Sequence, residues 1–241
     1  MSRFYVSPES VKGQKIYIEK EESHHIIDVM RLSRGDSVTV FDGRGKEYEG
    51  AIASTENKKV SIDILKTKIK DKESLVNISL AQAIPKKDKM DLIVQKATEL
   101  GVKEILPFES ARTVVKARGE RGKHKKERWD KIAIEASKQC GRVELPKIKE
   151  TVYFDTILDS IPKYNLTVMP CFSKKAVFLK GALKNKAKKL FVIIGPEGGF
   201  TDDEIRRAEE KGAVSVSLGS LVLRSETAAI ATISILNYEL Q

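Results

Sequence analysis

Cysteine and histidine are scarce in this chain, and their scarcity excludes several kinds of site. Among 241 residues there are two cysteines, Cys140 and Cys171, and three histidines. They form no Cys-x-x-Cys pair and no His and Cys cluster of the kind that binds zinc. The sequence therefore predicts neither a disulfide framework nor a metal site.

Long apolar runs are also missing. The longest, such as residues 190–194, are far shorter than the roughly 20 residues that a membrane-spanning helix needs. The first residues, MSRFYVSPES, lack the charged and then apolar pattern of a secretory signal. We therefore expect a cytoplasmic protein that has no membrane partner.

Positive charge is abundant. Lys and Arg number 44 against 34 Asp and Glu, a formal net charge of +10. A protein with such an excess of positive charge could bind a polyanion such as nucleic acid. A basic surface that only contacts solvent explains the net charge equally well. Residues 112–129, RTVVKARGERGKHKKERW, hold eight Lys or Arg and two Glu, and predict a mobile cationic loop that grips phosphates or, alternatively, a solvated linker. Within this segment, Trp129 has helical spacing with Ile132, Ala133 and Ala136, which predicts that the Trp129 side chain anchors a helix to the core.

Two hydrophobic patterns divide the chain near residue 72. Before it, the segments KIYIEK, DSVTVFDG, EYEGAIAS and KKVSIDIL alternate with turns, which predicts a small β-barrel or sandwich with one helix near residues 24–32. After it, short apolar runs alternate with helical patterns, which predicts βαβ units and a mostly parallel sheet. We therefore expect domains at residues 1–72 and 73–241, the second with an α/β fold.

The first candidate binding loop follows the apolar run LFVIIG. It reads Gly195-Pro196-Glu197-Gly198-Gly199-Phe200 and leads into a capping-box sequence, Thr201 to Glu204. Loops at the carboxyl ends of parallel strands form the ligand crevice, and glycines let the backbone approach a ligand closely. The sequence matches neither the dinucleotide nor the phosphate-loop fingerprint. It predicts a binding loop of another kind, with a plain turn as the alternative.

The second candidate loop lies about twenty residues further on. Residues 218–228, LGSLVLRSETA, stand between a predicted strand and an almost wholly apolar helix. Polar groups in such a place need hydrogen-bond partners. Helix capping by Ser225 and the helix dipole beside Glu226 account for two of them. Arg224 remains, and we expect it to contact a substrate.

Several segments, taken in order, resemble one known family. They are Arg3-Phe4, HHIIDVMRLSRGD, KATELGV, RWDKIAIEASKQCGR, IGPEGGF and LGSLVLRSETA. The chain resembles, over essentially its whole length, the bacterial RsmE methyltransferases of the SPOUT superfamily, which modify N3 of a uridine in 16S ribosomal RNA. The resemblance implies a SPOUT-type C-terminal methyltransferase domain with a trefoil knot and a small N-terminal PUA-like β-barrel.

The resemblance also implies S-adenosyl-L-methionine as cofactor, the 16S rRNA or small ribosomal subunit as partner, and a homodimer. The residues expected to bind the cofactor are Met169, Gly195, Pro196, Glu197, Gly198, Gly199, Leu218, Gly219, Leu223, Arg224, Thr227 and Ala228. The resemblance further implies that the segment Met169-Pro170-Cys171-Phe172 forms a third wall of the cofactor site. The residues expected to bind RNA are Arg3, Arg31, Arg34, Lys86, Lys87, Arg112, Lys116, Arg118, Arg121 and Lys123.

Methylation of N3 requires loss of the imide proton from a base that is unpaired or flipped out. We assign to Arg224 the stabilisation of negative charge on the deprotonated ring, and expect Arg3 or Glu197 to orient or deprotonate the base. Two alternatives are a non-catalytic ribosome assembly factor and a related methyltransferase for another RNA position, such as a ribose 2′-hydroxyl.

Overall fold

The computed structural model describes residues 2–69, 76–117, 119–173, 175–183 and 187–240. These residues form two compact units. Unit 1 comprises residues 2–69 and Ser137–Leu145, and unit 2 comprises residues 76–136 and 146–240. The domain boundary expected after residue 72 lies outside the described residues.

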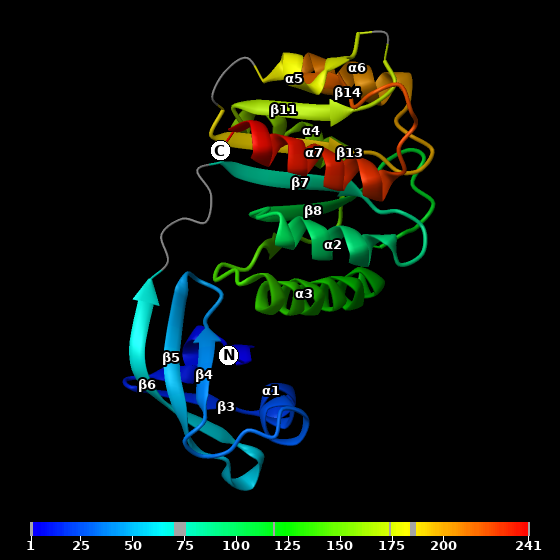
Figure 1. Ribbon diagram of the computed structural model, residues 1–241. Helices are drawn as coiled ribbons and strands as arrows, with labels where there is room; N and C mark the ends of the chain where they lie inside the picture. Colours follow the sequence, from blue (N-terminus) through cyan, green and yellow to red (C-terminus); the bar gives the residue numbers. More distant parts are fainter. Residues whose placement is uncertain (1, 70–75, 118, 174, 184–186, 241) are drawn as a thin grey trace. The chain divides into compact units, whose positions relative to one another are not determined.

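Unit 1 is built on a six-stranded sheet (Figure 1). The strands are β1 (Ser2–Tyr5), β2 (Val11–Lys12), β3 (Lys15–Ile18), β4 (Ser37–Phe41), β5 (Lys46–Ser54) and β6 (Val60–Ile69). Their order is β1-β4-β5-β6-β3-β2, and each pair is antiparallel except β1 with β4. Alternate residues such as Ile16, Val38, Val40 and Ile62 enter one apolar cluster, as the period of a β-strand requires.

The helix of unit 1 differs in extent from the one expected over residues 24–32. The α-helix α1 (Lys20–His24) starts earlier and continues as one π-helical turn, η2 (His25–Val29). It ends before Arg31, whose φ of 53° is left-handed and cannot continue a right-handed helix. Two single 3-10 turns, η1 (Pro8–Ser10) and η3 (Glu56–Lys58), complete the unit.

Arg3 fastens residues 137–145 to the sheet of unit 1. Its guanidinium donates to the carbonyl oxygens of Ser137 at 2.6 Å and Arg142 at 2.7 Å, and to Glu47 Oε2 at 3.2 Å. It also lies 4.0 Å from the centre of the Phe41 ring. Because these contacts occupy the side chain, they support a structural role, and the catalytic and RNA-binding roles predicted for Arg3 stay predictions.

Unit 2 contains an eight-stranded sheet in which every pair is parallel. The strands are β7 (Asn77–Ala83), β8 (Glu104–Glu109), β9 (Lys147–Ile148), β10 (Val152–Tyr153), β11 (Leu166–Pro170), β12 (Val177–Phe178), β13 (Lys189–Ile194) and β14 (Ala213–Ser217). Their order is β10-β8-β7-β13-β11-β14-β12, with β9 beside β8. The predicted α/β fold with a mostly parallel sheet is confirmed.

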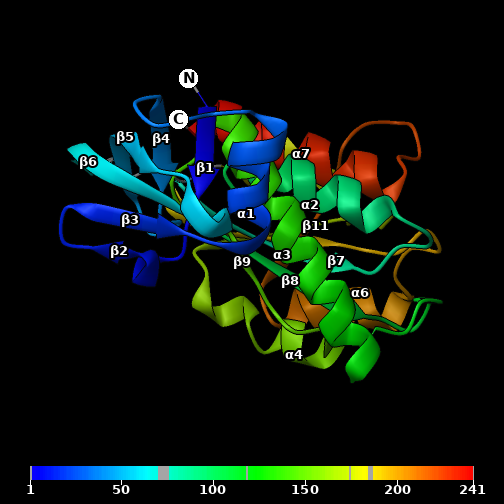
Figure 2. The same ribbon diagram turned by 90° about the horizontal axis from the view of Figure 1, so that it is seen from below.

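Helices cover both faces of this sheet (Figures 1 and 2). The helices of unit 2 are α2 (Lys89–Glu99), α3 (Glu120–Cys140), α4 (Phe154–Leu158), α5 (Leu179–Ala182), α6 (Asp202–Glu210) and α7 (Ser225–Leu240), with a 3-10 turn η4 (Ile161–Lys163). The last four residues of α3 belong to unit 1. Residues of α2, α3, α5 and α7 share one apolar cluster with Leu190 and Val192. Residues of α4 and α6 share the other with Phe191 and Ile193. Alternate residues of β13 thus enter opposite layers, which explains its unbroken apolar sequence.

The cationic segment at residues 112–129 is not the continuous mobile loop that we expected, because α3 begins at Glu120. Lys, Arg and Glu are strong helix formers, so a run of them is compatible with a helix once an apolar side faces the core. Trp129 supplies that side and is 3% exposed, which confirms its predicted place in the core. Lys126 pairs with Asp130 at 2.7 Å, and Arg128 pairs with Asp91 of α2.

We predict that Arg3→Ala lowers the free energy of unfolding by about 2 to 4 kcal/mol, because it leaves Glu47 and two carbonyl oxygens without their donor. Urea unfolding measures this change. Arg44→Ala is the control: its ion pair with Glu9 is exposed, so we expect a loss below about 0.5 kcal/mol. An Arg3 variant that unfolds at the wild-type urea concentration would contradict the structural role.

Candidate functional site

A pocket of about 510 Å³ lies where three neighbouring strands of unit 2 end. Strands β13, β11 and β14 are adjacent and parallel, so the loops at their carboxyl ends meet at one edge of the sheet. We call residues 195–200 loop 1 and residues 218–224 loop 2. Both line this pocket, together with residues 170–172.

Most residues predicted to bind a cofactor line this pocket. They are Gly195, Pro196, Glu197, Gly198, Gly199, Leu218, Gly219, Leu223, Arg224 and Ala228. The other two do not line it: the Met169 side chain is fully buried in the core, and Thr227 is exposed on the first turn of α7. Of the segment 169–172, expected to form a third wall of the site, residues 170–172 line the pocket.

The expected third wall at residues 169–172 is present through Pro170, Cys171 and Phe172, whereas sequence reasoning did not single out Leu221 and Val222 as lining residues. The rule that located loop 1 also applies to residues 171 and 172, because they directly follow a strand of the same parallel sheet. Leu221 and Val222 carry no polar group that would have marked them. Burial raises the pKa of the Cys171 thiol, so this thiol is a weak nucleophile at neutral pH.

The hydroxyl of Ser225 joins the two loops to the sheet. It donates to the carbonyl oxygen of Gly195 at 2.7 Å and accepts a hydrogen bond from Gln82 Nε2 at 2.9 Å. Ser225 is 7% exposed and is the first residue of α7. The sequence suggested that Ser225 caps the helix. In the structure its hydroxyl instead links the start of α7 to Gly195 and Gln82, which are far from it in the sequence.

Lys89, at the start of α2, is an ionic partner shared by loop 1 and the start of α7. Its Nζ lies 3.5 Å from Glu197 Oε1 in loop 1 and 3.4 Å from Glu226 Oε2 at the start of α7. Glu197 Oε1 also accepts a hydrogen bond from the backbone N–H of Lys86 at 2.9 Å. Burial raises the pKa of Glu197, but hydrogen bonds from backbone N–H groups and the charge of Lys89 outweigh it, so that the pKa lies below its ordinary value. Glu197 is therefore an ionised carboxylate and a weak proton acceptor.

Arg112, predicted to bind RNA, holds loop 1. Its Nη1 donates to the carbonyl oxygens of Gly198 at 2.8 Å and Phe200 at 3.2 Å. A Cβ atom on Gly198 would stand 3.3 Å from Arg112 Cβ, so glycine gives the closest fit there. The Phe200 ring, at the end of loop 1, is parallel to the Phe108 ring at a centroid distance of 6.5 Å and tilted against the Phe154 ring at 5.5 Å.

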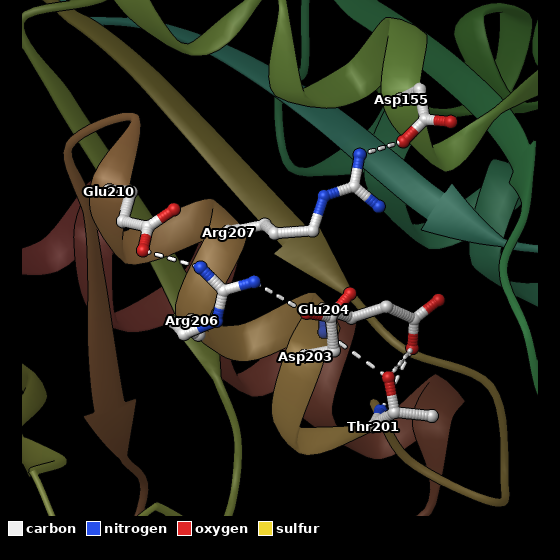
Figure 3. Close-up of polar contacts among 7 residues, drawn as sticks. All are labelled: Asp155, Thr201, Asp203, Glu204, Arg206, Arg207 and Glu210. Atoms are coloured by element: carbon white, nitrogen blue, oxygen red, sulfur yellow. Dashed lines mark hydrogen bonds and ion pairs between the residues drawn. The ribbon is translucent and has the colours of Figure 1, made fainter.

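The helix after loop 1 fixes the far end of that loop (Figure 3). Thr201 Oγ1 accepts from the N–H of Glu204 at 3.2 Å, and Glu204 Oε2 accepts from the N–H of Thr201 at 2.8 Å, which confirms the predicted capping box. Arg206 bridges Asp203 and Glu210 at 2.6 Å each. Arg207 pairs with Asp155 of α4, so α6 is held both at its start and from the side.

Arg224 is a cation of the pocket whose guanidinium N–H groups are available to a ligand. It is exposed and lines the pocket. Among the residues that the structure describes, its guanidinium makes no hydrogen bond or ion pair. By contrast, Arg112 and Lys89 are both engaged by loop 1. Arg224 is therefore able to bind a negatively charged or carbonyl-bearing group in the pocket.

The other residues predicted to bind RNA are exposed. Arg31 and Arg34 belong to unit 1. Lys86, Lys87, Lys116, Arg121 and Lys123 belong to unit 2, and Arg118 lies outside the described residues. Metal sites and membrane spans were also sought in the described residues. Among these residues, no group of three or more His, Cys, Asp or Glu side chains could hold a metal ion. None of the described helices combines the length and apolar character that crossing a membrane requires.

We predict that Ser225→Ala loosens loop 1, because a partly buried carbonyl oxygen and a buried amide each lose a partner. The free energy of unfolding should fall by about 1 to 3 kcal/mol. Urea unfolding measures this, and hydrogen exchange followed by mass spectrometry should show faster exchange in loop 1. The exposed Ser220 provides the control, since Ser220→Ala should change neither quantity. Faster exchange spread evenly over unit 2 would contradict the local role.

The chain matches two family models. One, described as an RNA methyltransferase domain, matches residues 72–237, and the other, described as an RNA methyltransferase PUA domain, matches residues 18–65. The ribosomal RNA small subunit methyltransferase E of Bacillus subtilis is 34% identical over 228 residues, covering 92% of this chain and 89% of that protein.

Solved structures agree with these matches. Ribosomal RNA small subunit methyltransferase E from Neisseria gonorrhoeae, solved with bound S-adenosyl methionine, has a TM-score of 0.88 and 33% identity, covering 98% of this chain and 96% of that one. A Legionella pneumophila protein, also solved with this cofactor, has a TM-score of 0.90 and 34% identity, covering 99% and 97%. The chain therefore belongs to the ribosomal RNA small subunit methyltransferase E family, whose α/β methyltransferase domain is accompanied by a PUA domain.

Proposed function

We propose that this protein transfers a methyl group from S-adenosyl-L-methionine to N3 of a uridine in the 16S rRNA of the small ribosomal subunit. The observation that carries the proposal is one pocket lined by both glycine-containing loops, with Arg224 in its wall. Family membership supplies the reaction class. The chemistry of the pocket supplies the roles of the residues.

The pocket residues fit the cofactor. Ligand sites typically occupy about 300 to 1,000 Å³, and this pocket has about 510 Å³. Apolar side chains such as Leu218 and Leu223 suit the faces of an adenine ring, while the backbone of Gly198, Gly199 and Gly219 leaves polar groups accessible for its edges. Glu197, held ionised, complements a positively charged ligand. When bound, S-adenosyl-L-methionine supplies a methyl group on a positively charged sulfur.

Arg224 acts on the RNA base. N3 of uracil lies between two carbonyl groups and must lose its proton before it can form a bond to carbon. A guanidinium donates well to such oxygens and stabilises the negative charge that spreads onto them. Because the side chain of Arg224 is free of partners among the described residues, it can do this without breaking another interaction. Glu197 orients loop 1 rather than accepting the proton, because its lowered pKa makes it a weak base.

RNA is bound by exposed basic residues on both units. Arg31 and Arg34 contribute from unit 1, and Lys86, Lys87, Lys116, Arg121 and Lys123 from unit 2. Arg118, outside the described residues, belongs to the same basic segment. Phosphate contacts of this kind release counterions, so binding should weaken with salt. The assignment of a PUA domain to residues 18–65 supports RNA contact by unit 1.

The finer architecture is proposed on the same basis. We assign to the C-terminal part of unit 2 the trefoil knot of the SPOUT superfamily, and to the sheet of unit 1 the closed barrel of a PUA-like domain. Two chains pair through α7. This helix is largely apolar, and two of its large side chains, Ile235 at 37% and Tyr238 at 84%, are exposed and available to a partner. Its ribosomal substrate is assembled in the cytoplasm, where the enzyme acts.

The proposal predicts that the purified protein adds one methyl group per 16S rRNA, recovered as N3-methyluridine. The substrate is small ribosomal subunits from a bacterial strain that lacks this methyltransferase, and mass spectrometry of the digested nucleosides identifies the product. Arg224→Ala should lower turnover at saturating subunits about 100-fold, the usual cost of removing one charge-stabilising donor.

The matched control is Arg206→Ala, which removes an exposed arginine on α6 that is paired with Asp203 and Glu210. It should retain wild-type turnover. A methyl group on a ribose, or an rRNA that stays unmodified, would refute the proposed function. Wild-type turnover by Arg224→Ala would refute the role of Arg224 alone.

The lowered pKa of Glu197 predicts the pH dependence of the reaction. Its carboxylate is already ionised at neutral pH, so any rise of kcat/KM between about pH 6 and 10 reports another group, which we assign to the substrate imide. Glu197→Gln should therefore lower kcat/KM without moving the midpoint of that rise. Initial rates across this pH range test it, and a rise that disappears in Glu197→Gln would identify Glu197 as the base.

A further inference from the structure

Three large apolar side chains stand in solvent at the mouth of the pocket. Phe172 is 71% exposed, Leu221 is 77% and Val222 is 78%, and all three line the pocket. By contrast, two residues of its floor are buried, Ile194 at 2% and Val216 at 0%. The pocket thus has a buried floor and an apolar rim, which comes from the segments that follow β11 and β14.

The backbone that carries Phe172 is held in place. The N–H of Cys171 donates to the carbonyl oxygen of Val216 at 3.1 Å, which ties this segment to β14. On the other side, the carbonyl oxygen of Ser173 accepts from the N–H of Ala176 at 3.0 Å. The side chain of Cys171 packs partly buried against the core, whereas that of Phe172 is exposed. Packing within the fold does not explain an aromatic residue there, because most of its surface remains in water.

A macromolecular substrate can reach such a pocket only through its mouth. N3 is on the pairing edge of uracil, so the base must leave its stack before it reacts. A flipped pyrimidine presents two flat apolar faces and an edge with two carbonyl oxygens. The rim supplies an aromatic side chain for a face, and Arg224 in the same pocket supplies donors for the edge.

We propose that Phe172 is the platform on which the flipped target uracil stacks, with Leu221 and Val222 completing an apolar rim around it. This inference rests on the proposed function and adds a substrate-positioning residue to it. Phe172 replaces part of the stacking that the base loses when it leaves the RNA. The cofactor, when bound, would be held by the buried floor of the pocket and by the backbones of loops 1 and 2.

The test compares Phe172→Ala, Phe172→Leu and Phe172→Tyr with wild type on unmodified small subunits. Removing an aromatic stacking partner should lower kcat/KM for the subunit about 10- to 100-fold. Phe172→Tyr keeps the ring and should stay near wild type, whereas Phe172→Leu keeps only apolar volume and should resemble alanine. Calorimetric titration of S-adenosyl-L-methionine without RNA should give a Kd within about twofold of wild type in all three.

Phe178→Ala is the matched control, because Phe178 is 72% exposed on β12 but is not among the residues that line the pocket. It should retain wild-type kcat/KM. Unchanged kcat/KM in Phe172→Ala overturns the inference. A cofactor Kd that rises as much as kcat/KM falls makes Phe172 a cofactor contact and also overturns it, as does a shift in oligomeric state by sedimentation velocity. A wild-type protein that methylates no RNA refutes the proposed function, and the inference with it.

Discussion

The Ser225 hydroxyl is the constraint on which the pocket depends. With one donor and one acceptor it binds the carbonyl oxygen of Gly195 and the side-chain amide of Gln82, and so joins β7, loop 1 and the start of α7. The bond to Gln82 is buried and the bond to Gly195 is partly buried, and a hydrogen bond lost there without replacement leaves a polar group unsatisfied. Lys89 adds an ionic link between the same segments through Glu197 and Glu226. Together they hold in register two glycine-containing loops whose backbones could otherwise adopt many conformations.

That constraint acts at the edge of a parallel sheet. Because β13, β11 and β14 run side by side in one direction, three chain segments distant in sequence must emerge next to each other. The helices on either face bury alternate residues of β13, so a shift by one residue would move each of its side chains into the opposite layer of the core. The position of loop 1 is thus fixed by packing at its start and by the capping box of α6 at its end. Rigid supports of this kind allow loops to carry function.

Much of this architecture was predictable because period-two and helical patterns are local. The parallel sheet, the capping box, the core place of Trp129 and the two candidate loops follow from short segments read alone. The bond from Ser225 to Gln82 does not, since its partners are 143 residues apart, and nothing near Ser225 distinguishes bridging from capping. The start of α3 was missed because Lys and Arg suit a helix and a solvated loop alike, and the core contact of Trp129 decides between them. At the end of β11 the wall begins at Pro170 and not at Met169, a difference set by which side of the strand faces the core.

The charges around the pocket bear on how the proton of the base is removed. A strong general base would need a raised pKa, yet the carboxylate in loop 1 is held ionised by backbone N–H groups and Lys89, and its pKa is lowered. A cation next to the uracil ring favours proton loss in a different way. It lowers the pKa of the imide and stabilises the anion that results. Solvent can then take the proton. In the mechanism that we propose, Arg224, the pocket cation without a partner among the described residues, matters more than any base, and Glu197 acts through the loop that it holds in place.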